Sequence, residues 1–110
     1  MSSKAYWKYD PSLDATDILV AAGPCSLKGY HFLNTTAAVA YVQIFDAAAA
    51  SDVTIGTTTP DFVLGIPASA GALMALGDGI KFTKGIVAAS CTAVGGSTGA
   101  IIVATFFIGS

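Results

Sequence analysis

Short apolar runs, separated by turn-forming residues about every 8 to 12 positions, dominate this chain of 110 residues. The runs are rich in β-branched and aromatic residues, and none shows the 3.6-residue period of a long amphipathic helix. Turn signals such as Gly23-Pro24, Asn34-Thr35-Thr36 and Gly77-Asp78-Gly79 separate them. This spacing predicts an all-β protein, an antiparallel sandwich or barrel of about eight short strands. The candidate strands are 17–22, 26–33, 38–45, 53–56, 60–66, 72–76, 80–89 and 100–108.

The run 38–45 (AVAYVQIF) is the clearest strand, and it is largely apolar on both of its faces. A strand of this kind is either covered on both sides or lies at a contact between subunits. Tyr41 and Phe45 share one of its faces, because side chains two or four positions apart point the same way. We therefore treat Tyr41 and Phe45 as candidate interface residues.

The first 16 residues differ from the rest of the chain. They show neither strand nor helix periodicity, and they contain the single tryptophan. The sequence predicts an extended N-terminal arm over residues 1–16 and one sandwich domain over residues 17–110. Tyr6, Trp7 and Tyr9 are the candidate contact residues of the arm, which would dock on its own body or on a neighbour. Under this interpretation, removal of the arm leaves the sandwich folded.

Charged residues make up only 11% of the sequence, against 54% hydrophobic residues. Lysine supplies all five positive charges and aspartate all seven negative ones, which gives a formal net charge of −2. A chain without arginine and without a lysine cluster is not expected to bind nucleic acid. So few charges cover a domain of this size thinly, and large uncharged surfaces mark contacts with other proteins. We expect an oligomer or a protein held against a larger partner.

The sequence offers few parts for catalysis. Gly95-Gly96-Ser97-Thr98-Gly99 matches the nucleophile pattern G-x-S-x-G, but no Asp or His follows it and the next run reads as a strand. His31 is the single histidine, and within an apolar strand we interpret it as a core or interface residue. We expect no enzymatic activity, no catalytic residues and no cofactor.

Cys25 and Cys91 allow one pairing, and we expect both to be buried free thiols. Together with His31 they lack the spacing of zinc ligands, so no metal site is predicted.

Residues 86–108 carry no charge and are long enough to cross a bilayer. The stretch holds no leucine, its centre reads as a turn, and 101–108 has strand composition, so we expect no membrane contact. A tail-anchored membrane protein that uses 86–108 remains the less favoured alternative.

Three segments are similar to small virion proteins of tailed bacteriophages. They are Lys28–Asp46 (KGYHFLNTTAAVAYVQIFD), Phe62–Pro67 (FVLGIP) and Gly79–Ile86 (GIKFTKGI), in that order. The chain from about 26 to 108 resembles the cement, or decoration, proteins of phage capsids. Their motifs are structural, and residues 1–16 have no counterpart in them.

The resemblance implies a jelly-roll-like sandwich that sits on the outer capsid surface of the virion and ties neighbouring major capsid subunits together. It implies two partners, the major capsid protein and further copies of the chain itself, as a homo-oligomer and specifically a trimer. It also implies synthesis in the host cytoplasm. Another phage structural role, in a tail or a fibre, is the alternative within this class.

Overall fold

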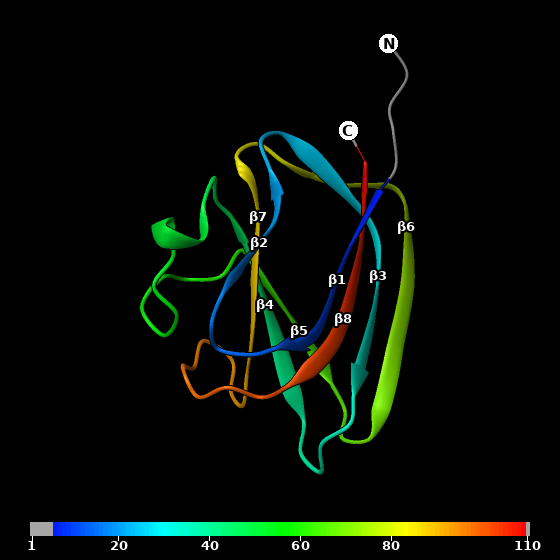
Figure 1. Cartoon of the computed structure of the whole chain (residues 1–110), viewed down its shortest axis with the longest axis vertical. Helices are drawn as coiled ribbons and strands as arrows, with labels where there is room; N and C mark the ends of the chain where they lie inside the picture. The colour runs from blue at the N-terminus through cyan, green and yellow to red at the C-terminus, as the bar shows by residue number, and fades with distance from the viewer. Residues whose placement is uncertain (1–5, 110) are drawn as a thin grey trace.

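The computed structural model describes residues 6–109, which form eight strands and one short 3₁₀ helix (Figure 1). The strands are β1 (Tyr6–Leu13), β2 (Ile18–Ala22), β3 (Cys25–Asn34), β4 (Ala40–Asp46), β5 (Phe62–Ile66), β6 (Ala70–Phe82), β7 (Gly85–Cys91) and β8 (Ile102–Gly109), and the helix is η1 (Ala50–Asp52). Two antiparallel sheets face each other. Sheet A has the order β1-β8-β3-β6, and sheet B has the order β2-β7-β4-β5.

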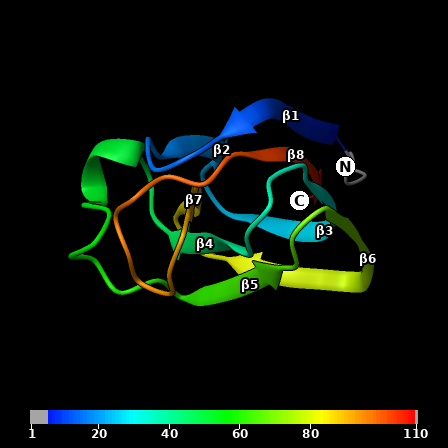
Figure 2. The same cartoon turned by 90° about the horizontal axis from the view of Figure 1, so that it is seen from below.

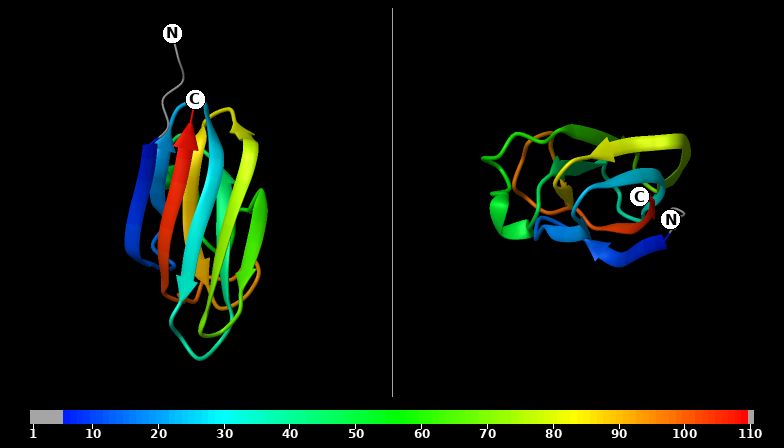
Figure 3. Two further views of the ribbon diagram at one scale, coloured as in Figure 1. Left: turned by 90° about the vertical axis from the view of Figure 1, so that its right-hand side faces the viewer. Right: turned by 90° about the horizontal axis from the view of Figure 1, so that it is seen from above.

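The two halves of the chain pair like the two arms of one long hairpin. β1 pairs with β8, β2 with β7, β3 with β6 and β4 with β5. These pairs alternate between sheets A and B, so the hairpin is wound around the core, as in a jelly roll (Figure 3). The prediction of an all-β, jelly-roll-like antiparallel sandwich with about eight strands is confirmed.

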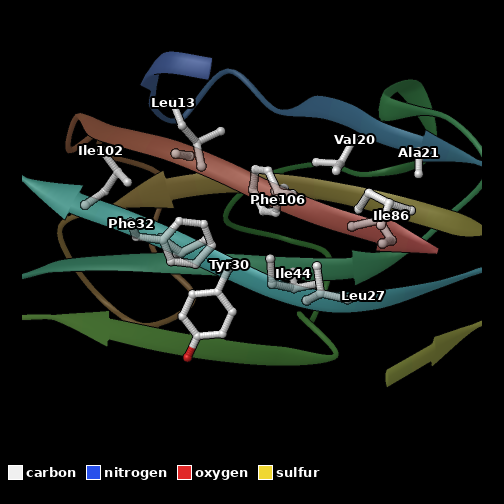
Figure 4. Packing of buried hydrophobic residues seen from close by; sticks show 14 of the residues in the cluster. Leu13, Val20, Ala21, Leu27, Tyr30, Phe32, Ile44, Ile86, Ile102 and Phe106 are labelled. Atoms are coloured by element: carbon white, nitrogen blue, oxygen red, sulfur yellow. The ribbon is translucent and has the colours of Figure 1, made fainter. Parts of the chain in front are cut away.

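The side chains between the sheets form one hydrophobic core, and its largest members are almost fully buried (Figure 4). On the sheet A side, Phe32 stacks on Tyr30 with ring centroids 4.6 Å apart and meets Phe106 edge-on at 5.2 Å. Ile44 and Ile86 enter the core from sheet B. Burial of each such side chain contributes about 1.5 to 3 kcal/mol, so these contacts hold the two sheets together.

Sheet B is covered on its outer side as well. The segment between β4 and β5 lies over it, and Phe45, Ala47, Val53 and Val87 form a second, smaller core there. Figure 1 shows this segment on the opposite side of the molecule from β6. The two apolar faces of β4 are therefore explained by cover on both sides within one chain.

The described part of the predicted N-terminal arm lies on the body of the sandwich. β1 is an edge strand of sheet A, paired with β8, and its Leu13 is fully buried. Of the two docking partners considered for this segment, its own body and a neighbour, the structure shows its own body. A register shift between Asp10 and Leu13, around Pro11, interrupts the alternation and hides the strand from sequence analysis. Residues 1–5 lie outside the described part of the chain.

Gly77-Asp78-Gly79 does not reverse the chain as predicted. β6 runs through it, and four residues, 76–79, lie opposite Lys28 of β3 as a bulge. Gly77 and Gly79 have φ values of 60° and 89°. Positive φ serves a bulge as well as a tight turn, so the glycines alone cannot distinguish the two.

Two other predicted elements change in consequence. The chain reverses at Thr83-Lys84, so the expected strand 80–89 is divided between β6 and β7. Residues 53–56 form no strand; they follow η1 as a loop and turn.

Candidate interaction surface

No other segment of the described chain covers the outer face of sheet A (Figure 3). The strand pairings arrange its side chains in rows that run across the strands. Residues paired across neighbouring strands point to the same side of a sheet. The pairings place three rows here, which we call together the sheet A face: Trp7, Phe107, Gly29 and Ala75; Tyr9, Thr105, His31 and Leu73; and Val103, Leu33 and Gly71.

Large apolar side chains are exposed across the whole width of the sheet A face. Trp7 on β1 is 70% exposed, and Leu73 on β6, at the opposite edge, is 73% exposed. Tyr9, Phe107 and Leu33 lie between them and are exposed too. Exposed apolar surface of this kind is typical of sites that interact with other molecules.

The three rows of the sheet A face contain no Lys or Asp, and the neighbouring Lys28 and Lys81 lie beyond the Phe107 row on the same outer side of the sheet. Lys8 and Asp10 of β1 alternate with Trp7 and Tyr9, so they point to the other side of the strand. A partner that covers the face would therefore not have to strip water from an ion, which is one of the large costs of association.

Gly29 leaves the middle of the sheet A face without a protruding side chain. A Cβ atom on Gly29 would lie 2.6 Å from the Met74 carbonyl oxygen and 3.6 Å from Cδ2 of Phe107. The backbone of β6 and the Phe107 ring thus occupy the space that a side chain would need. A flat centre between exposed aromatic and leucine side chains suits contact with another flat protein surface.

Sheet B offers no comparable face, because two loops close its outer side. The segment 47–61 covers Phe45, as described above, and the loop between β7 and β8 covers Gln43, whose Nε2 donates a hydrogen bond of 3.1 Å to the Gly96 carbonyl. The two loops touch: a Cβ on Gly56 would lie 2.8 Å from Cβ of Ser97. The sandwich is therefore closed on one side and bare on the other.

The five residues predicted as interface residues lie in four different places. Trp7 and Tyr9 lie on the sheet A face. Tyr6 is exposed on the same strand but points to the other side of it, and Tyr41 is half-buried on sheet B. Phe45 is 1% exposed and packs under the 47–61 segment of its own chain.

Sequence analysis missed Phe107, Leu33 and Leu73, although the signal for Phe107 is in the sequence. Residues 102–108 alternate strictly, and Val103, Thr105 and Phe107 fall on the face opposite the core. Leu33 and Leu73 become neighbours of Phe107 only through the pairing of β3 with both β8 and β6. That pairing is not readable from local pattern.

The residues considered for catalysis and metal binding are spread over the molecule. His31 lies on the sheet A face, whereas Ser97 lies in the loop over sheet B. Cys25 and Cys91 are buried free thiols in different sheets, and burial raises the pKa of both. Within residues 6–109 no three His, Cys, Asp or Glu side chains are grouped closely enough to hold a metal ion.

Asp46 lies at the rim of a hollow of about 260 Å³, beside Asp61 and Lys84, and its role there is structural. Oδ1 accepts hydrogen bonds from the backbone N–H groups of Lys84 (2.9 Å) and Gly85 (3.3 Å). Oδ2 accepts from the backbone N–H (3.1 Å) and the hydroxyl (3.0 Å) of Thr83. Burial opposes ionisation of this carboxyl, but the four hydrogen bonds outweigh it and hold its pKa below the ordinary value.

The sequence matches no protein-family model, and no curated protein matches it. Among residues 6–109, no helix has the length and apolar character needed to cross a bilayer. The predicted alternative of a membrane helix over 86–108 is wrong, because these residues form β7, a loop and most of β8.

Proposed function

We propose that this protein is a structural component of a virion, a capsid cement protein that binds the outer capsid surface and bridges neighbouring major capsid subunits. Its partners in this proposal are the major capsid protein and other copies of itself. The resemblance of residues 26–108 to phage decoration proteins suggested this role. The observation that supports it best is the sheet A face, which is flat, bears exposed aromatic side chains and has no Lys or Asp in its three rows. A surface of this kind is suited to contact with another protein.

The composition of the sheet A face matches what binding energy requires. Aromatic side chains, tryptophan and tyrosine above all, supply most of the energy of protein interfaces, because they bury large area at low entropic cost. Trp7 and Tyr9 are held on a hydrogen-bonded strand. They therefore lose less freedom on binding than they would on a loose arm.

Shell stabilisation follows from mass action. A protein that binds only the assembled shell, across the junction of two subunits, lowers the free energy of the assembled state relative to separated subunits. This role has no chemical step, and the residues that perform it contact the partner surface directly.

The test places a lysine at the centre of the face. In a Thr105→Lys variant, the ammonium group must be desolvated whenever a partner covers the face. Thr57→Lys is the matched control, since Thr57 is exposed in the 47–61 segment over sheet B. We expect Thr105→Lys to weaken binding to purified capsids lacking the protein by at least about 30-fold, which corresponds to about 2 kcal/mol. Thr57→Lys should bind as the unchanged protein does.

Occupancy is measured by co-sedimentation with tailless capsids and, in parallel, with purified tails, and circular dichroism verifies that both variants are folded. Binding to tails alone would replace the capsid role with the tail or fibre role. Equal capsid occupancy for Thr105→Lys and Thr57→Lys would contradict the use of the sheet A face, and no binding to either particle would contradict the proposal as a whole.

A further inference from the structure

The described sandwich has four edge strands, β1 and β6 in sheet A and β2 and β5 in sheet B. An edge strand presents unpaired backbone N–H and C=O groups, and proteins usually block such edges against pairing with other chains. β1 is blocked in three ways. It carries the charges of Lys8 and Asp10, it contains Pro11, and a register shift follows Asp10.

Both edges of sheet B are blocked as well. β2 has only five residues, with a register shift between Leu19 and Ala21. β5 also has five residues, and Pro60 and Pro67 stand on either side of it. Short, interrupted strands leave little room for a ladder with another chain.

β6 is the exception. Its straight part, residues 70–76, pairs with β3 on one side and is free on the other, and Figure 2 shows it at the margin of the molecule. The segment AGALMAL contains no charge and no proline. Leu73 and Met74 are exposed on its two faces, at 73% and 47%. The other three edge strands are protected against pairing with another chain, and β6 is not. This difference indicates that another strand covers the edge of β6.

We propose that β6 pairs antiparallel with β6 of a second copy, across a two-fold axis, so that two sheets A become one continuous sheet. An antiparallel ladder is symmetric, so a strand fits its own copy without adjustment. A segment without charge has no like charges to bring together. With the axis at Leu73, the two copies of Leu73 face each other, and Ala72 lies opposite Met74 of the partner subunit, so that a small side chain meets a large one on that side of the ladder.

The available area suits a reversible dimer. Seven strand residues extend about 24 Å, and the free side of β6 lies on the side of the molecule that faces along its shortest axis, where the molecule is 27 Å wide (Figure 2). The contact is therefore at most roughly 650 Å² per copy and about 1,300 Å² in total, near the lower limit of about 1,000 Å² for specific interfaces. We expect dissociation in the micromolar range.

This dimer does not depend on the proposed virion role, because it forms from purified protein alone. It also differs from the trimer that the resemblance to decoration proteins implies, since a two-fold contact closes after two copies. The mass of the assembly therefore distinguishes the two.

Sedimentation velocity of the purified full chain over about 5 to 500 μM tests the inference. We expect a concentration-dependent dimer, and amide hydrogen exchange slowed in residues 70–76 as the dimer forms. Met74→Lys should weaken the dimer at least tenfold, because it places two ammonium groups near the two-fold axis. The matched control is Val94→Lys, which alters an exposed apolar side chain in the loop between β7 and β8 and should leave the dimer unchanged.

Met74 shares a face with core residue Tyr30, so its substitution leaves the sheet A face intact and separates this test from the capsid test. If Met74→Lys does not fold, Leu73→Lys on the opposite side of the strand takes its place in the sedimentation experiment. A monomer at every concentration, a trimer, or a dimer that a folded edge variant does not weaken would each overturn the inference.

Discussion

At the scale of single residues, the Asp46 carboxylate holds the turn between β6 and β7 in place. It ends β4 and receives four hydrogen bonds from Thr83, Lys84 and Gly85, which form the reversal between β6 and β7. Gly85 is needed at the end of this turn, since a Cβ there would lie 2.7 Å from the carbonyl oxygens of both Ala21 and Ala47. The aspartate and the glycine together fix where the chain turns back.

Asp46→Asn should therefore destabilise the protein by about 1 to 3 kcal/mol near neutral pH, because the amide loses charge and turns a donor toward N–H groups. The folded pKa of Asp46 lies below its ordinary 3.8. Its contribution is thus fully present above that value and is lost as the pH falls through the lower, folded pKa. Urea denaturation at several pH values measures this, and the difference between Asp46→Asn and the unchanged protein should shrink below about pH 4.

The control is Asp52→Asn, which alters an exposed carboxylate of η1 and should change the unfolding free energy by less than about 0.5 kcal/mol. An equal effect of the two substitutions, or a difference independent of pH, would contradict the role given to Asp46.

At the scale of elements, β1 determines whether the sandwich is complete. Its Leu13 contributes to the main core, and the Asp14 carbonyl just beyond accepts a hydrogen bond from the Ser90 amide of β7. Leu13→Ala should cost about 2 to 5 kcal/mol of unfolding free energy, as large-to-small changes in a core do. Removal of residues 1–16, which the idea of a separate arm would tolerate, should prevent cooperative folding.

Leu19→Ala on β2 is the matched control, since Leu19 is 36% exposed, and its cost should stay below about 1 kcal/mol. Thermal unfolding followed by circular dichroism compares the two variants. If Leu13→Ala reduced the unfolding free energy no more than Leu19→Ala, β1 would not be an integral part of the sandwich.

The same elements show how far the sequence predicts the fold. β3, β4 and β8 were located to within about two residues, because their alternation is strong and both ends carry turn residues. β1 was missed, since an edge strand with charges and a proline has no clean period. β6 was divided at Gly77-Asp78-Gly79, where a bulge and a turn have the same local chemistry. The sheet A face could not be predicted, because it is assembled from four strands that meet only through long-range pairing.

At the scale of the whole molecule, the three rows of the sheet A face contain no lysine or aspartate, although the formal net charge is −2. Among the described residues, Lys28 and Lys81 lie beyond the Phe107 row on the same outer side of sheet A. Salt screens attraction between charges over about 10 Å at 0.1 M, but it does not weaken contact between apolar surfaces. If this face binds the capsid, occupancy at fixed protein concentration should change less than about twofold between 0.05 and 0.5 M NaCl. Association should also be slow, about 10⁵ to 10⁶ M⁻¹s⁻¹, because the three rows themselves carry no lysine or aspartate to steer the encounter. Ammonium sulfate should instead strengthen binding, since it favours apolar burial.

Capsid co-sedimentation across the salt series and stopped-flow association measure these effects. A steep loss of occupancy with NaCl would assign the contact to Lys and Asp side chains elsewhere on the molecule, and the sheet A face would then lose its proposed role.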